Sequence, residues 1–237
     1  RVLTVDGYLL EIERGQHIAT PGGGFEIALP DGAVRRFPVP SYPAPSVKKS
    51  SMGYYSGPEV DLIDLFIGSE GTLGVITGVK IALIRPPPAM FAALVFTRDE
   101  PAAIDLATAL RQASEYKRSG RAGSMIDARA IEHMDGASLD LIRARGLHTK
   151  LKVTLPDTAR MALYFEIELS EKTADTAIQD DLDRVAMGSF VGSPAGQLFN
   201  LLAKRRLLDS LELALPGEPS RLTAFRASPK TSSSSPG

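Results

Sequence analysis

The stretch GSEGTLGVIT, residues 68–77, says more about this chain than any other part of its sequence. It places glycines at 68, 71 and 74 around small polar residues. Glycine permits positive φ and lets a ligand approach the backbone, and the N–H groups of such a turn can hold a phosphate or the polar edge of an adenine. Its spacing is neither the dinucleotide-binding fingerprint nor a P-loop. The residues alone therefore leave two interpretations open, a ligand-binding loop and a structural turn.

The segments on either side predict how this stretch is framed. Residues 59–67 have the apolar spacing of a short helix, on which we expect Asp61 and Asp64 to face solvent. After the stretch, Val79, Ile81 and Leu83 alternate as in a strand. The triple proline at 86–88 makes a stiff linker and predicts a domain boundary.

The N-terminal 40 residues predict β hairpins. Strand-forming residues flank the turn signals Asp6-Gly7 and Asp31-Gly32. Residues 22–24 are three glycines, which we interpret as a flexible loop because strand-like residues follow them. Prolines at 38, 40, 43 and 45 exclude a helix or a central strand, so residues 38–58 predict a long irregular loop.

The remainder predicts a second domain in which elements follow in the order β-α-α-β-α, an α+β sandwich. The expected segments are a strand at 89–97, helices from 99 and over 127–145, a strand at 163–169, and helices from 170 and over 195–214. We expect His133 on the surface of its helix, and Glu166 and Glu168 on a solvated strand face. The Ser/Pro-rich residues 228–237 predict a disordered tail.

Composition excludes several classes of function. The chain of 237 residues has no cysteine, which rules out disulfides, thiolate metal sites and cysteine nucleophiles within it. Its three histidines lie far apart, so no metal site is predicted. A formal net charge of −1 gives no reason to expect nucleic acid as a partner. The chain opens with Arg1 and directly with a strand-like stretch, and we expect that a preceding segment is missing.

Two longer stretches carry a family resemblance. LFIGSEGTLGVIT (65–77) resembles a hallmark of the vanillyl-alcohol oxidase/p-cresol methylhydroxylase superfamily of flavoproteins, in particular its D-lactate dehydrogenase, glycolate oxidase and alkyl-dihydroxyacetone-phosphate synthase group. VKKSSMGYY (47–55) is similar to the K-K-N-x-x-G-Y segment of that family, with Ser50 in place of the asparagine. FEIALPDG (25–32) suits the same domain, and weaker likeness continues to about residue 215 through SMIDARAIEHMDG (124–136) and ALYFEIEL (162–169).

The resemblance implies an α+β fold: residues 1–88 as the second half of an FAD-binding domain of the p-cresol methylhydroxylase type, and residues 89–227 as part of a ferredoxin-like substrate (cap) domain. It implies FAD as cofactor and assigns no catalytic residue. The implied cofactor-binding residues are Lys49, Gly53, Tyr54, Gly68, Ser69, Glu70, Gly71, Thr72, Gly74, Val75, Ile76 and Thr77.

The implied activity is oxidation of a 2-hydroxy acid, such as lactate or glycolate, by hydride transfer to the flavin. Two alternatives stay open: an FAD enzyme like alkyl-dihydroxyacetone-phosphate synthase, and a non-catalytic remnant or interaction module. The glycine-rich pyrophosphate loop and the H-x-G-D-G-N-x-H segment of the family have no match here, so we expect the isolated chain to be inactive. The expected partners are a small-molecule substrate and an electron acceptor that the sequence does not identify. A homodimer stays open, and we expect a cytoplasmic protein, with a membrane-peripheral setting open.

Overall fold

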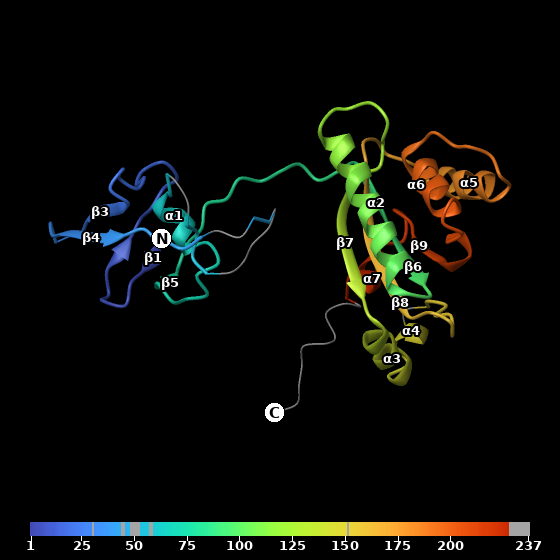
Figure 1. Cartoon of the computed structure of the whole chain (residues 1–237), viewed down its shortest axis with the longest axis horizontal. Coiled ribbons are helices and arrows are strands. Elements are labelled where there is room, and N and C mark those ends of the chain that lie inside the picture. Colours follow the sequence, from blue (N-terminus) through green and yellow to red (C-terminus); the bar gives the residue numbers. More distant parts are fainter. Residues whose placement is uncertain (30, 44–45, 48–52, 57–58, 151, 228–237) are drawn as a thin grey trace. The chain divides into compact units, whose positions relative to one another are not determined.

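The computed structural model describes residues 1–227 apart from positions 30, 44–45, 48–52, 57–58 and 151. The chain forms two compact units, Arg1–Ile84 (unit 1) and Arg85–Gly237 (unit 2). Their division lies beside the triple proline, in a stretch (77–87) without helix or strand (Figure 1). Because proline has no N–H group and a fixed φ, it disfavours helix and strand in such a connection.

Unit 1 is built from short antiparallel strands. Its first sheet has the order β2-β1-β5, from Val2–Leu3 (β1), Leu9–Leu10 (β2) and Val75–Ile76 (β5). The predicted turn between β1 and β2 is confirmed: the Gly7 amide donates to Thr4 O at 3.0 Å, and Gly7 has a φ of +84°. A left-handed φ of this kind is accessible to glycine without steric cost.

The second predicted hairpin of unit 1 is also confirmed, with strands β3 (Gly24–Ala28) and β4 (Val34–Pro38). Helix α1 (Leu62–Phe66) follows after the long loop and packs against this hairpin. Together they bury a small core of five residues: Phe25, Ile27, Val60, Leu62 and Leu65. This core supports the segment at residues 68–77, which directly follows α1.

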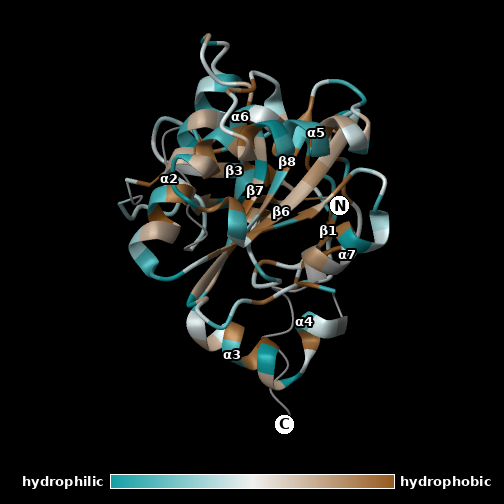
Figure 2. Cartoon of the chain, turned by 90° about the vertical axis from the view of Figure 1, so that its right-hand side faces the viewer, coloured by the Kyte–Doolittle hydropathy of each residue, from teal (hydrophilic) through white to brown (hydrophobic). Residues whose placement is uncertain are grey.

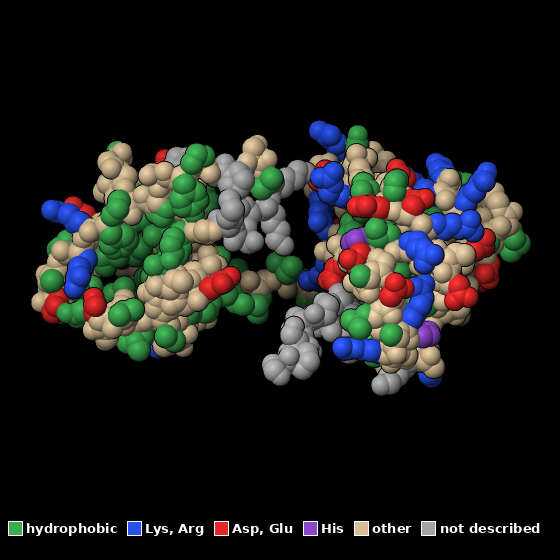
Figure 3. All heavy atoms as spheres, turned by 60° about the horizontal axis from the view of Figure 1, so that its bottom comes forward, with side chains coloured by type: hydrophobic (Ala, Val, Ile, Leu, Met, Phe, Trp, Pro, Cys, Tyr) green, Lys and Arg blue, Asp and Glu red, His purple; other side chains and the backbone are tan. Residues whose placement is uncertain are grey.

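The strand predicted for Val79, Ile81 and Leu83 is wrong. The β5–β1 ladder ends where the Arg1 amino group donates to Gly78 O, and no described strand pairs with residues 79–84. All three side chains are exposed, as are Val75 and Ile76 of β5. On the face seen in Figure 3, apolar side chains cover much of unit 1. Alternation alone favours a strand, but a strand also requires a partner for its N–H and C=O groups.

Unit 2 contains one antiparallel four-stranded sheet of order β7-β8-β6-β9. Its strands are β6 (Ala89–Thr97), β7 (Ala128–Met134), β8 (Met161–Leu169) and β9 (Leu211–Ala214). The central strands β6 and β8 pair over nine residues, from Ala89 opposite Leu169 to Thr97 opposite Met161. With α2 and α5 as crossovers, the strands follow the split β-α-β order, and the expectation of an α+β fold is confirmed.

Helices cover both faces of this sheet (Figures 1 and 2). One face packs against α2 (Glu100–Arg118), α5 (Asp175–Ala186) and α6 (Pro194–Ala203) in a cluster of 19 buried residues. The other face packs against α3 (Gly136–Ala144) and α7 (Pro219–Ala227) in a cluster of 11. The short elements α4 (Leu147–Lys150) and η1 (Leu208–Ser210) complete the unit.

Two predicted helices of unit 2 are wrong. Residues 127–145 split into strand β7 and helix α3, with Asp135 between them as the N-cap of α3. Residues 195–214 split into α6, η1 and strand β9. In both cases the apolar residues of the segment fit a helical spacing as well as a strand. The segment forms a strand because pairing with β8 or β6 buries these residues in the sheet. The order β-α-α-β-α is therefore replaced by the four-stranded arrangement.

Candidate functional site

The glycine-rich stretch of unit 1 forms two consecutive tight turns after α1. In the first, the Ser69 amide donates to Phe66 O at 3.3 Å, and Ile67 (φ −71°) precedes Gly68 (φ +77°), as in a type II turn. In the second, the Thr72 amide donates to Ser69 O at 3.0 Å. The sequence predicted glycines with positive φ in this stretch, and the structure confirms that.

The second turn holds a non-glycine residue in the left-handed region. Glu70 has a φ of +51° and Gly71 a φ of +80°, so both central residues have the sign of φ found in a type I′ turn. A left-handed φ is uncommon for a residue with a Cβ and carries strain, which tends to gather at binding sites. The glycines thus specify the turn, and the left-handed φ of Glu70 adds backbone strain to it.

Exposed amides line this turn. Within the described part of the chain, the N–H groups of Glu70 and Gly71 donate no hydrogen bond, and both residues are exposed. Ser69, in contrast, is buried and its carbonyl accepts from both the amide and the hydroxyl of Thr72, the latter at 2.6 Å. The turn therefore presents two exposed N–H donors that no described residue accepts from, an arrangement that can bind an anion or a carbonyl oxygen.

A side chain from the long loop reaches this turn. The Tyr54 hydroxyl lies 2.6 Å from Thr72 Oγ1. Since the single hydroxyl hydrogen of Thr72 is donated to Ser69 O, the Tyr54 hydroxyl is the donor of this bond. The Tyr54 ring also packs against the core of unit 1. The two predicted cofactor-binding segments, 18 residues apart at this bond, thus meet in space.

The end of the stretch is fixed to the sheet rather than free to close on a ligand. Gly74 has a φ of +147°, and a Cβ there would lie 2.6 Å from Leu3 O, so only glycine fits against β1. Val75 and Ile76 form β5, and the Thr77 amide donates to Arg1 O at 2.9 Å. These residues position the turn by their backbone, while the side chains of Val75 and Ile76 point to solvent.

The long loop places another predicted residue against an aromatic ring. Gly53 has a φ of +69°, and a Cβ there would lie 2.7 Å from the Tyr42 hydroxyl oxygen. The buried Ser56 hydroxyl donates to Tyr42 O at 3.0 Å and closes this part of the loop. Sequence reasoning missed the Tyr42–Ser56 contact, since no local pattern pairs these residues. The predicted residue Lys49 lies outside the described residues.

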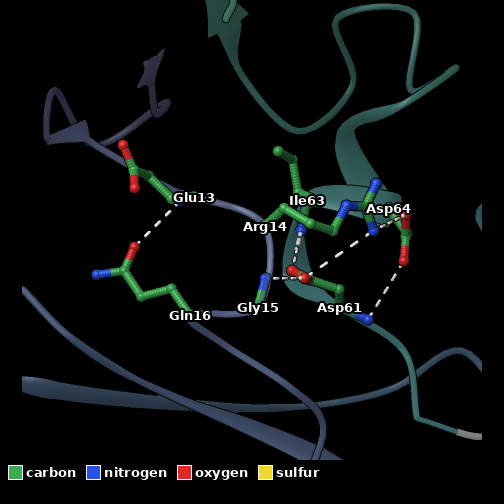
Figure 4. A network of polar contacts seen from close by, with 7 residues as sticks. All are labelled: Glu13, Arg14, Gly15, Gln16, Asp61, Ile63 and Asp64. Carbon is green, nitrogen blue, oxygen red and sulfur yellow. Dashed lines mark hydrogen bonds and ion pairs between the residues drawn. The ribbon is translucent and has the colours of Figure 1, made fainter. Parts of the chain in front are cut away.

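The expectation that Asp61 and Asp64 face solvent is wrong (Figure 4). Asp61 is only 3% exposed: it is the N-cap of α1, and its carboxylate accepts from the amides of Ile63 (3.1 Å) and Gly15 (2.6 Å). Asp64 completes a capping box through the Asp61 amide and pairs with Arg14 at 2.6 Å. The D-x-x-D spacing is the signal that reveals this cap. The network fixes α1, whose last turn leads into the glycine-rich stretch.

The structure also tests two expectations about side-chain exposure in unit 2, at Glu166 and at His133. Glu166 is 6% exposed and accepts from the Tyr164 hydroxyl at 2.5 Å, so the predicted solvated face is wrong at this position, which lies on the central strand β8 between β6 and β7. Glu168 pairs with Arg129 at 3.2 Å. His133 is exposed as expected, although it lies on strand β7.

Neither a metal-binding cluster nor a membrane-spanning helix is present among the described residues. No group of three or more His, Cys, Asp or Glu side chains in the described ranges is arranged to hold a metal ion. Among the same residues, every helix is too short or too polar to cross a bilayer.

Known proteins similar to this chain include two enzymes named for D-2-hydroxyglutarate. The chain is 29% identical over 200 residues to the mitochondrial D-2-hydroxyglutarate dehydrogenase of Danio rerio. This alignment covers 82% of the present chain and 32% of the zebrafish protein. It is 39% identical over 67 residues to the D-2-hydroxyglutarate–pyruvate transhydrogenase DLD3 of Saccharomyces cerevisiae, covering 28% of this chain and 11% of that protein. The chain thus spans about a third of the length of the zebrafish relative and a smaller share of the yeast relative. No family model matches the chain.

Proposed function

We propose that the chain is part of an FAD-dependent oxidoreductase that oxidises D-2-hydroxyglutarate or a related 2-hydroxy acid. Both relatives named above are enzymes of D-2-hydroxyglutarate, which favours this over the alternative of an ether-lipid synthase. The observation that carries the proposal is the turn at Ser69–Thr72: its exposed Glu70 and Gly71 amides donate no hydrogen bond to any described residue, and its Thr72 hydroxyl bonds to Tyr54. The flavin, when bound, supplies the acceptor for a hydride from the substrate carbon.

The residues of unit 1 fit part of such a cofactor. The Glu70 and Gly71 amides would hold a phosphate oxygen or an adenine acceptor, since exposed donors in a rigid turn need no reorganisation to bind. Tyr54 holds Thr72 and thereby keeps the turn in place. Gly74 keeps β5 against β1, so the turn has a fixed base.

We further propose that residues outside this segment complete the active site. The chain corresponds to about a third of the zebrafish relative. We assign residues 1–88 to the FAD-binding domain and residues 89–227 to the substrate domain. On this proposal, a glycine-rich pyrophosphate loop and the H-x-G-D-G-N-x-H segment come from the remaining polypeptide.

Titration of FAD with the purified 237-residue chain, followed by quenching of flavin fluorescence, tests the proposal. Gly71→Ala is the informative variant: nothing lies within 4 Å of the added Cβ, so it acts only by disfavouring the left-handed φ. Gly32→Ala, with a φ of +84° and equally open space in the β3–β4 turn, is the matched control. We expect Gly71→Ala to weaken FAD binding at least five-fold, as roughly 1 kcal/mol of strain implies, and Gly32→Ala to leave it unchanged.

The same titration is repeated with the chain extended by its natural flanking sequence. Binding only by the extended chain would still support the proposal if Gly71→Ala weakens it. Failure of both chains to bind FAD would reject it and leave the interaction module as the better interpretation. Binding that Gly71→Ala does not affect would place the cofactor elsewhere.

A further inference from the structure

Residues 79–84 of unit 1 have the sequence pattern of a strand but no strand partner. Val79, Ile81 and Leu83 alternate with polar or small residues, and each of the three apolar side chains is more than two-thirds exposed. Among the described residues, none exchanges a backbone hydrogen bond with this stretch. A row of exposed N–H and C=O groups beside apolar side chains is a template for pairing with a further strand.

The hydrogen bonds of Arg1 show in which register such a strand would continue. The Thr77 and Gly78 amides both donate to Arg1 O, at 2.9 and 3.4 Å, and the Arg1 nitrogen donates to Gly78 O at 2.9 Å. Two residues thus oppose one residue of the antiparallel neighbour β1, which is the arrangement of a β-bulge. Because a bulge shifts the register by one residue without ending the pairing, the position directly before Arg1 would oppose Val79.

The other neighbour of β1 agrees with this register. β2 pairs with β1 so that Leu10 lies opposite Val2. Continued beyond Arg1, that register places Glu13 opposite the second position before Arg1, and the bulged register places Lys80 opposite the same position from the other side. Residues opposite one position share a face of the sheet, and Lys80 Nζ does lie 3.8 Å from Glu13 Oε1. The two side chains thus meet over the path of the further strand.

We propose that a β-strand from polypeptide N-terminal to Arg1 pairs antiparallel with residues 79–84 and covers their apolar side chains. The proposal rests on the proposed function in one respect, that the chain is part of a longer protein, and it does not depend on the flavin. The alignment with the zebrafish relative covers 32% of that protein, which leaves ample polypeptide for such a strand. Counted backwards along the chain, its first, third and fifth residues oppose Val79, Ile81 and Leu83, so we expect them to be apolar.

Disulfide trapping in the chain extended at its N-terminus by its natural sequence tests the register. The 237 residues contain no cysteine, and any cysteine in the added part is replaced by serine. Ile81→Cys is combined with a cysteine at the third position before Arg1. This is a non-hydrogen-bonded pair with Cα atoms about 4.5 Å apart, within the range of a disulfide.

Lys80→Cys and Ala82→Cys, each combined with the same partner cysteine, are the matched controls. Their side chains point to the opposite face of the sheet from that of residue 81. We expect the disulfide to form at least about ten-fold faster with Ile81→Cys than with either control, because only that pair has the required geometry.

Amide exchange of the extended chain without any substitution gives an independent measurement. The amides of Lys80, Ala82 and Ile84 should point toward the new strand and exchange at least about ten-fold more slowly than in the 237-residue chain. The amides of Val79 and Ile81 point away from it and should change little.

Faster trapping with Lys80→Cys or Ala82→Cys would overturn the bulged register. Neither a disulfide nor slower exchange in the extended chain would overturn the pairing itself. Exchange at residues 79–84 that slows with concentration in the 237-residue chain would show that a second copy pairs there, and would overturn the proposed occupant. A chain that forms the Ile81→Cys disulfide but binds no FAD would support the pairing and reject the proposed function.

Discussion

Unit 1 and unit 2 bury their apolar residues to different degrees. Unit 2 covers both faces of one long sheet, with buried clusters of 19 and 11 residues. Unit 1 has one cluster of five among its described residues, and leaves apolar side chains exposed along Val75–Ile76 and residues 79–84. From this difference we infer that unit 2 has the features of an independent domain. The exposed apolar surface of unit 1 is of the kind that other polypeptide usually covers.

The largest effect should come from the core of unit 2. Phe165 is 0% exposed at the centre of β8, and Phe165→Ala should lower the free energy of unfolding by about 3–5 kcal/mol through lost burial and a cavity. Leu83→Ala, at a site 85% exposed, should change it by less than about 0.5 kcal/mol. Urea unfolding of both variants measures the contrast. A large loss for Leu83→Ala would show that this side chain is packed in solution and break the comparison.

The core of unit 1 should respond without the core of unit 2. Phe25→Ala removes a buried ring that packs at 5.5 Å from Phe37 and should destabilise unit 1 by about 3 kcal/mol. Native-state hydrogen exchange should then show faster exchange in β3 and β4, with β6 and β8 unchanged. Equal acceleration in both units would mean that they unfold as one.

The buried cap of α1 predicts an effect of intermediate size. Asp61→Ala leaves the Gly15 and Ile63 amides without their acceptor and should cost about 2 kcal/mol of unit 1 stability. Glu11→Ala, which removes only an exposed pair with Arg1, is the control and should cost less than about 0.5 kcal/mol. Thermal unfolding followed by circular dichroism distinguishes the two variants, and similar losses would contradict the assignment of Asp61 as a buried cap.

The contact between the long loop and the glycine-rich turn should contribute less. Tyr54→Phe keeps the packed ring but removes the donor to Thr72, and should lower stability by about 0.5–1 kcal/mol. Amide exchange at Thr72 should become faster. Tyr55→Phe, at an exposed neighbouring position, is the matched control. If amide exchange at Thr72 is unchanged in Tyr54→Phe, the bond between the long loop and the glycine-rich turn does not stabilise the turn.

The smallest effect concerns acid stability of the β3–β4 turn. The Ala33 amide, and then the Tyr8 hydroxyl, hold the pKa of Asp31 below its ordinary value of 3.8. A lowered folded-state pKa contributes stability above 3.8, which is lost as the pH falls through the folded-state pKa. Asp31→Asn should therefore remove a small part of the acid sensitivity of unit 1. Urea midpoints of the wild type and the variant should converge as the pH falls below 3.8, and an unchanged difference would contradict this role.

Local sequence signals predicted the elements that depend on local physics. The turns at Gly7 and Gly32, the hairpin strands and the start of α2 at Asp99 follow from φ preferences, alternation and capping. The split of residues 127–145 did not follow, because Ile131 and Met134 suit either a helix or a strand facing β8. The resemblance located the candidate site, and the structure added the bond between Tyr54 and Thr72.

The sequence by itself determined where the chain turns and which stretch is unusual, because glycine, proline and alternation act over a few residues. Only the tertiary structure decided that Asp61 and Glu166 are buried and that His148 faces an apolar pocket. Their surroundings come from segments distant in sequence: Gly15 for the first, strands β6 and β7 for the second, and the β6–β7 sheet with α3 for the third. Burial is a property of those packed segments, and a local pattern does not contain it.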